Sequence, residues 1–141
     1  MKTKFRRILT LALTLVLICA LTATAFAAAS RTVEEETDSG ITVIEEGSIS
    51  NYSVSGEVYT DIGGRMTSLR ISIDYSYIKA GTTDTIIQDS YSSTAYNQYE
   101  HSDSETLDGS KCKKMVHATY MFRLEIPNED TFDSTPFTLY N

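Results

Sequence analysis

The sequence has 141 residues, with 12 basic and 19 acidic side chains and a formal net charge of −7. This length corresponds to one domain, and an acidic chain without a clustered basic patch is poorly suited to binding nucleic acid, whose phosphates require Lys and Arg. We therefore expect one globular domain and no nucleic-acid partner.

The first 27 residues have the three parts of a secretory signal peptide. Four basic residues and no acidic ones open the segment, an apolar run follows, and Ala25-Phe26-Ala27 supplies the small residues of a cleavage site. The segment is similar in style to bacterial Sec signals. We expect cleavage after Ala27 and a secreted protein, extracellular or in the cell envelope, with no membrane span left. The alternative is a retained membrane helix, because the run is about long enough to cross a bilayer.

Removal of residues 1–27 leaves eight basic and 19 acidic side chains, a formal charge of −11. Cys19 leaves with the signal, and Ile18 before it argues against a lipid anchor, since the bacterial lipobox has a small residue there. Cys112 then remains alone, so we expect no internal disulfide. A lone cysteine is either a buried small hydrophobe or a free thiol, and we favour burial because exposed thiols are reactive outside the cell.

Two segments alternate strictly between apolar and polar residues, which is the pattern of half-buried β-strands. In residues 69–77 every odd position is apolar or aromatic, and in residues 116–126 every even position is apolar. We expect the first to be the central strand of an antiparallel sheet. The strand predicted at residues 52–59 would join it as a hairpin through Gly63-Gly64, and residues 116–126 would lie beside it or across the core.

Weaker patterns fill the rest of the chain. Residues 28–40 are acidic with one larger apolar side chain, which indicates a flexible acidic lead. Residues 83–91 are typical of an edge strand, and the stretch 90–108, rich in Ser, Tyr and acids, indicates a loop with one short strand. Gly56 at an inward position predicts a bulge or a close approach by a facing side chain.

The fold predicted from these patterns is all-β. No stretch after the signal has a helical period, and Ser and Thr make up 30 of its residues. About seven strands joined by turns predict a single small antiparallel β-sandwich over residues 41–141, with an immunoglobulin-like architecture. The comparison is architectural only, because the sequence has no Trp and no cysteine pair of the antibody kind.

Three residues are the candidates for nucleophilic or zinc chemistry, namely His101, Cys112 and His117. On one continuous strand, Cys112 and His117 would point to opposite faces, and a single His in a Ser-rich loop is usually solvated. The three residues also lack the short paired spacings of zinc sites. We therefore expect no catalytic set and no cofactor.

Two other groups are candidate binding residues. The first group is acidic and has oxygen donors of the kind that calcium takes, namely Asp103, Glu105 and Asp108. Leu107 stands where an EF-hand loop needs an oxygen donor, so the stretch is not that motif. The alternative is that these are solvated acidic loops without a metal. The aromatic side chains of a second group lie in the same polar stretch and match the composition of adaptable recognition surfaces; the alternative is that they only cover sheet edges. These aromatic residues are Tyr91, Tyr96 and Tyr99.

The function predicted from the sequence is a secreted, non-catalytic binding or interaction module of the bacterial cell exterior. Its ligand would be an unknown protein or glycan, and its oligomeric state is open. The first alternative is a secreted bacteriocin-like or pore-forming effector, because the Ser- and Thr-rich outward strand faces with scattered apolar residues are compatible with amphipathic hairpins. The second is a weak hydrolase or a calcium-dependent module.

Overall fold

Strands make up the regular structure of residues 29–141, which are the residues described by the computed structural model; these residues contain no helix. The signal peptide expected at residues 1–27 lies outside them. The nine strands are β1 (Ala29–Glu36), β2 (Thr42–Ile49), β3 (Ser53–Thr60), β4 (Met66–Lys79), β5 (Ile86–Gln98), β6 (Glu100–Thr106), β7 (Cys112–Glu125), β8 (Phe132–Asp133) and β9 (Phe137–Tyr140). The prediction of an all-β fold is confirmed, with nine strands in place of about seven.

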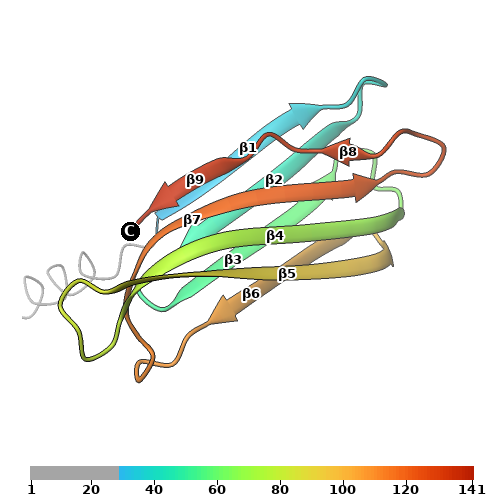
Figure 1. The fold of residues 1–141 in the computed structure, drawn as a ribbon. Helices are drawn as coiled ribbons and strands as arrows, with labels where there is room; N and C mark the ends of the chain where they lie inside the picture. Colours follow the sequence, from blue (N-terminus) through green and yellow to red (C-terminus); the bar gives the residue numbers. More distant parts are fainter. Residues whose placement is uncertain (1–28) are drawn as a thin grey trace, which may run out of the picture.

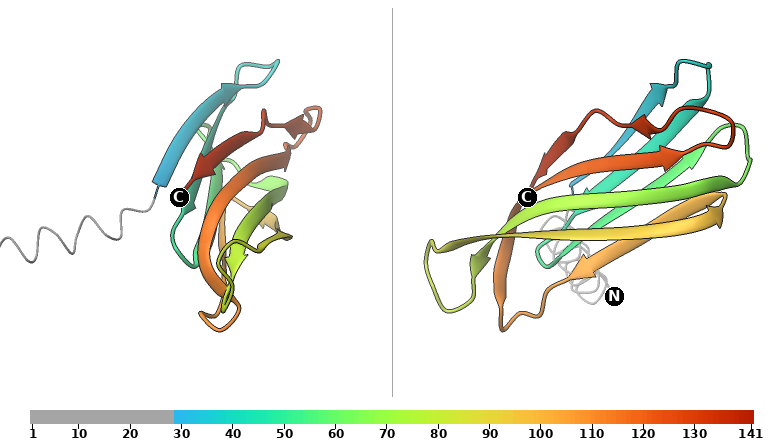
Figure 2. Two further views of the ribbon diagram at one scale, coloured as in Figure 1. Left: turned by 60° about the vertical axis from the view of Figure 1, so that its left-hand side comes forward. Right: turned by 45° about the vertical axis from the view of Figure 1, so that its right-hand side comes forward.

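The strands form two antiparallel sheets that face one another (Figures 1 and 2). The first sheet has the order β1-β2-β3-β6, and the second has the order β5-β4-β7-β8, with β9 also paired to β7. In Figure 1 the strands of the first sheet run obliquely behind those of the second. Each sheet therefore has one face in the interior and one face toward solvent.

The central position predicted for residues 69–77 is confirmed. They lie within β4, which pairs with β5 on one side and β7 on the other. The odd residues from Leu69 to Tyr75 are buried, and β7 contributes Ala118, Tyr120, Phe122 and Leu124 to the same core. Residues 116–126 thus lie beside β4 and not across the core from it.

The predicted hairpin through Gly63-Gly64 is wrong. Strand β3 has β2 and β6 on its two edges, so the connection from β3 to β4 passes from one sheet to the other. Gly63 does adopt a positive φ of 59°, as a turn requires. Two strands with one apolar face each bury that face equally well side by side or face to face, so the alternation could not distinguish the two arrangements.

A bulge in β7 changes the predicted alternation at one end. Ser76 pairs with His117 but Tyr77 pairs with Met115, so Val116 is the extra residue. Met115 is consequently fully buried, whereas Val116 is only half-buried. The prediction that Val116 points inward and Met115 outward is therefore wrong, while the alternation from Ala118 to Ile126 holds.

Two stretches expected to be irregular form strands. Ala29–Glu36, within the expected flexible lead 28–40, is β1, paired with β2 along its whole length. Most of 90–108, expected to be a loop with one short strand, belongs to β5 and β6. Thr and Tyr are good strand formers on a pleated surface, and backbone pairing with neighbours compensates for the weak apolar pattern.

Candidate functional site

The solvent-facing side of the first sheet carries two rows of side chains that cross all four strands. One row contains an aromatic ring between carboxylates, and the adjacent row contains two carboxylates between hydroxyl groups. The first row is Glu34, Ile44, Tyr59 and Glu100, and the second is Thr32, Glu46, Glu57 and Ser102. We call these eight residues the acidic face.

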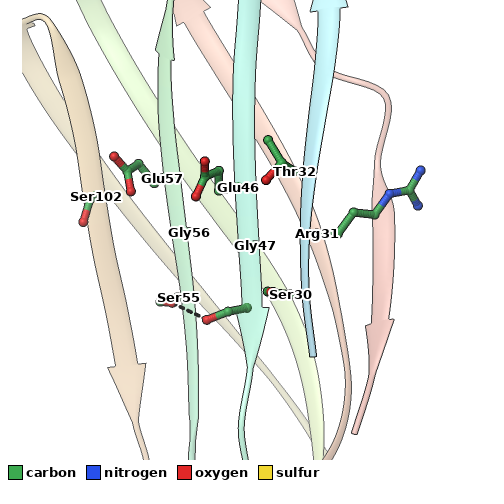
Figure 3. A pocket seen from close by; sticks show the side chains of 10 residues that line it. Ser30, Arg31, Thr32, Glu46, Gly47, Ser55, Gly56, Glu57 and Ser102 are labelled. Carbon is green, nitrogen blue, oxygen red and sulfur yellow. Dashed lines mark hydrogen bonds between the residues drawn. The ribbon is translucent and has the colours of Figure 1, made fainter. Parts of the chain in front are cut away.

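A groove of about 160 Å³ runs along the second row (Figure 3). Glu46 and Glu57 project from neighbouring strands on its upper side, and the Ser48 and Ser55 hydroxyls, 2.7 Å apart, hydrogen-bond on its lower side. Apart from Arg31, the polar side chains of the lining are carboxylates and hydroxyls, and Gly47 and Gly56 add apolar backbone surface between them. The lining consists of Ser30, Arg31, Thr32, Glu46, Gly47, Ser48, Ser55, Gly56, Glu57 and Ser102.

Tyr59 lies at the electrostatic centre of the acidic face. Desolvation raises the pKa of its hydroxyl, and the negative charges of four carboxylates raise it further. Those carboxylates belong to Glu46, Glu57, Glu34 and Glu100. A ring surrounded in this way stands in a strongly negative local potential, which favours a positive charge at its face.

No basic side chain of the described residues neutralises these carboxylates. Arg31 lines the groove but turns away from Glu46 and Glu57 (Figure 3), and its guanidinium carbon lies 5.5 Å from the centre of the Phe137 ring. Within residues 29–141 the one ion pair joins Arg123 and Asp133 at 3.6 Å, on the other sheet. The acidic face therefore carries uncompensated charge.

A pair of glycines lets the second sheet approach directly beneath the groove. Gly47 and Gly56 are partners across β2 and β3. A Cβ on Gly56 would lie 2.8 Å from Cγ2 of Ile71, and one on Gly47 would lie 3.0 Å from the Tyr120 ring. The close approach predicted for Gly56 is confirmed, and it fixes the strands that carry Glu46 and Glu57 against the core.

The three tyrosines predicted to bind a ligand are not grouped on one surface. Tyr91 and Tyr96 lie on β5, and their odd separation directs them to opposite faces of the sheet. Tyr91 is half-buried, whereas Tyr96 is 69% exposed. Tyr99 lies between β5 and β6, where Arg65 stacks on its ring at 5.2 Å. The loop expected to carry all three is thus replaced by two strands and a corner.

The three acids proposed as calcium ligands are also separated. Asp103 and Glu105 lie on the inward side of β6, where the Ser93 hydroxyl donates to Asp103 Oδ2 at 2.6 Å. Asp108 lies in the loop after β6, and its Oδ1 accepts from the backbone N–H of Ser110 at 2.7 Å. Residues 29–141 contain no group of three or more His, Cys, Asp and Glu side chains arranged to hold a metal ion.

Ser93, His101 and Asp103 are brought together between β5 and β6, but not as a catalytic triad. The Ser93 hydroxyl lies 3.0 Å from His101 Nε2, and its single proton is donated to Asp103. Because that proton is used, His101 Nε2 must be the donor in the other bond. In a triad the carboxylate contacts the far nitrogen of the imidazole, and the near nitrogen accepts from serine.

Cys112 and His117 occupy different sides of the second sheet. Cys112 is fully buried and free, and burial raises the pKa of its thiol, so the prediction of a buried cysteine is confirmed. His117 lies on the solvent side, where its Nδ1 is 2.9 Å from the Ser76 hydroxyl. The separation expected for this pair is therefore observed, because the two register shifts between them, at Val116 and Lys113, cancel in their effect on the alternation.

The acidic face was not predicted from the sequence. Its outward positions on β2 and β3 could be read from the alternation, and Tyr59 itself is at an outward position in that pattern. The row that joins Tyr59 to Glu34 and Glu100 depends on pairing with β1 and β6, two strands that the sequence patterns did not indicate.

Comparisons with known proteins do not indicate a function for the acidic face. No known protein family matches the chain, and no match is found among curated proteins. Residues 29–141 contain no helix that is long and apolar enough to cross a membrane.

Proposed function

We propose that the chain is an exported, non-catalytic binding module, and that its acidic face binds positively charged groups of a partner protein outside the cell. The observation that carries the proposal is the ring of Tyr59 among four carboxylates without a basic partner. An aromatic face attracts a Lys or Arg side chain, and surrounding carboxylates add charge-assisted hydrogen bonds.

The shape of the groove favours an extended ligand over an enclosed small molecule. Its volume of about 160 Å³ is below the roughly 300 to 1,000 Å³ of pockets that enclose drug-sized ligands. The two rows cross four strands, so the carboxylates are spread along the sheet and suit several cationic side chains on a basic segment.

The acidic face has a cost in the free protein that such a ligand would relieve. Glu46 and Glu57 are directly opposite one another on β2 and β3, and like charges in that position destabilise a sheet by up to about 1 kcal/mol. A bound ammonium or guanidinium group replaces this repulsion by attraction. Binding should accordingly weaken as salt screens the charges.

The test is titration of the mature protein with an eight-residue oligolysine and a neutral peptide of equal length, followed by isothermal calorimetry. The double variant Glu46→Gln/Glu57→Gln should bind oligolysine about tenfold more weakly, whereas the matched double variant Asp74→Asn/Glu125→Gln on the other sheet should bind as the wild type does. An equal loss of oligolysine affinity in both double variants would show that only the net charge of the protein matters, and would contradict a specific site.

A second comparison isolates the aromatic ring. Tyr59→Phe keeps a ring and should retain affinity, while Tyr59→Leu should lose a few-fold, because a cation over a ring at an exposed site contributes roughly 0.5 to 1 kcal/mol. Retained affinity in Tyr59→Leu would remove the ring from the proposal. Binding of amino-sugar polymers in place of basic peptides would identify a glycan as the ligand.

Export and the finer fold class belong to the same proposal. The basic, apolar and small-residue parts of residues 1–27 support secretion, and N-terminal sequencing of the secreted protein should begin at Ala28. An immunoglobulin-like sandwich architecture is supported by two facing antiparallel sheets of similar size.

A further inference from the structure

Strand β5 is the one long sheet edge of the described chain without protection against pairing. The edges of the first sheet carry charges: Arg31 and three consecutive glutamates on β1, and Glu100, Asp103 and Glu105 on β6. The other edge of the second sheet is divided into the short strands β8 and β9 with Pro136 between them. Charges, Pro and short length are the usual means of preventing edge pairing.

By contrast, β5 has 13 residues, no Pro, no Lys and a single charge, Asp89. Its pairing with β4 runs from Met66–Gln98 to Ile78–Ile86 without a register shift. The strand is almost neutral, and Asn97 near its end has a positive φ of 54°. One outward donor, the Ser90 N–H, is used by Asp89 Oδ1 at 2.8 Å. The other outward backbone groups of a long edge strand are a template for another strand.

The hydrogen-bond pattern identifies the backbone groups that point outward. The N–H of Lys79 donates to the carbonyl of Thr85 at 2.8 Å, so this opposed pair is a hydrogen-bonded one. Since the register is unbroken, odd residues of β5 bond to β4 and even residues point to the free edge. These even residues are Ile86, Gln88, Ser90, Ser92, Thr94, Tyr96 and Gln98.

We propose that β5 pairs antiparallel with β5 of a second copy of this chain, about a two-fold axis at Ser92. This register opposes residues 88–96 of the two copies in the part of the strand before Asn97, whose φ is 54°, and it brings the outer residues 86, 87, 97 and 98 alongside one another. It places Ser90 opposite Thr94 of the second copy, so free-edge residues face free-edge residues throughout. The second sheet would then continue across two molecules through one isologous interface.

The side chains of β5 fit this register. Tyr96 and Ile86 are the exposed large hydrophobic residues of the strand, at 69% and 58% exposed. Tyr96 would lie opposite Gln88 of the second copy and diagonal to its Ile86, on the same face. Aromatic rings reach diagonal neighbours across strands and pack on β-branched side chains. Tyr96 and Ile86 of each copy would thereby be partly buried, and the two-fold symmetry gives two such contacts.

The charges of β5 itself permit the same partner, and the acid nearest the axis, Asp103 of β6, is hydrogen-bonded to Ser93 at 2.6 Å. Asp89 would face Ala95 of the second copy, and the two Asp89 carboxylates would be six residues, or roughly 20 Å, apart along the strand direction. The remaining opposed pairs are neutral, for example Tyr91 with Ser93 of the second copy. On an acidic protein, this neutral strip is where a second acidic copy can approach.

Cross-linking at the axis tests the register. In a Cys112→Ala background, Ser92→Cys places two thiols opposite one another with Cα atoms about 5.5 Å apart, within the range of a disulfide. Thr94→Cys is the control, because its two copies would be four residues, or about 14 Å, apart. We expect a covalent dimer from mild oxidation of the first variant only. Equal cross-linking of both variants would overturn the register.

Sedimentation equilibrium of the mature protein tests the association itself. We expect concentration-dependent dimers between about 10 µM and about 1 mM. Tyr96→Ser should weaken the dimer about tenfold or more, because two symmetric contacts are lost, whereas Ile62→Ser, another exposed hydrophobic residue outside β5, should not. A wild-type protein that stays monomeric over this range overturns the proposal, and the oligolysine experiment is unaffected by that result.

Discussion

Replacing Glu45 by Gln should stabilise the protein increasingly as the pH rises. Glu45 lies on the inward side of β2, is 0% exposed, and neither carboxylate oxygen has a hydrogen-bond partner. Burial raises its pKa from 4.5 to about 8, and the negative charge of nearby Glu35 adds to the rise. Ser134 offsets part of it, although its hydroxyl makes no bond of normal geometry with the carboxyl and accepts from the Phe122 N–H.

The magnitude follows from the difference between the folded and unfolded states. The folded protein keeps the Glu45 proton up to about pH 8, while the unfolded chain releases it near pH 4.5. Between these values the folded state binds more protons, so the free energy of unfolding falls by about 1.4 kcal/mol per pH unit. At pH 7 the accumulated loss is about 3 kcal/mol, a large part of the stability of a small domain.

The assay is urea denaturation of the wild type and Glu45→Gln at several pH values from 5 to 8. Gln has the same shape as the protonated acid and no titration, so the difference in free energy of unfolding should be small at pH 5 and about 3 kcal/mol at pH 7. Glu125→Gln, at an exposed position of β7, is the control and should show no such trend. A Glu45→Gln difference that does not change with pH would refute the reasoning.

Three further substitutions or probes test the packing. Gly56→Ala should destabilise by about 1 to 3 kcal/mol in thermal denaturation, because its Cβ would lie 2.8 Å from Ile71 Cγ2; unchanged stability would show that the sheets separate easily. Ile73→Asp should abolish folding as seen by circular dichroism, since it buries a charge in the core, while Asp74→Ala on the outer face should fold. The Cys112 thiol should react with a thiol reagent only after unfolding, and a fast reaction of the native protein would contradict its burial.

The strongest sequence patterns predicted the centre of the structure. Alternation in residues 69–77 and 116–126 identified β4 and β7, because each has one face in the core and one in solvent, although the bulge reverses the predicted faces of Met115 and Val116. Periodicity reports which face of a strand is buried, and outside the bulge the predicted faces were correct. It does not report which strand lies alongside, so the partner of β3 was assigned wrongly.

The edges of the sheets could not be predicted in the same way. Strands β1, β5 and β6 have weak apolar patterns, since one of their sides lies at the rim of the core, and they depend on backbone pairing with the neighbouring strand. Long-range pairing leaves no local signature in the sequence. The acidic face was missed for this reason, because Glu34 and Glu100 meet Tyr59 only through those edge strands.

Because the acidic face and the free edge of β5 lie on different sheets, a dimer would affect how tightly a multivalent ligand binds. Tyr59 belongs to the sheet β1-β2-β3-β6, and the free edge of β5 belongs to the other. Joining two molecules through β5 therefore leaves both acidic faces uncovered, so a partner with two basic segments could occupy both. The second segment would then bind at an effective concentration in the millimolar range, and two weak sites would hold a multivalent ligand far more tightly than either does alone.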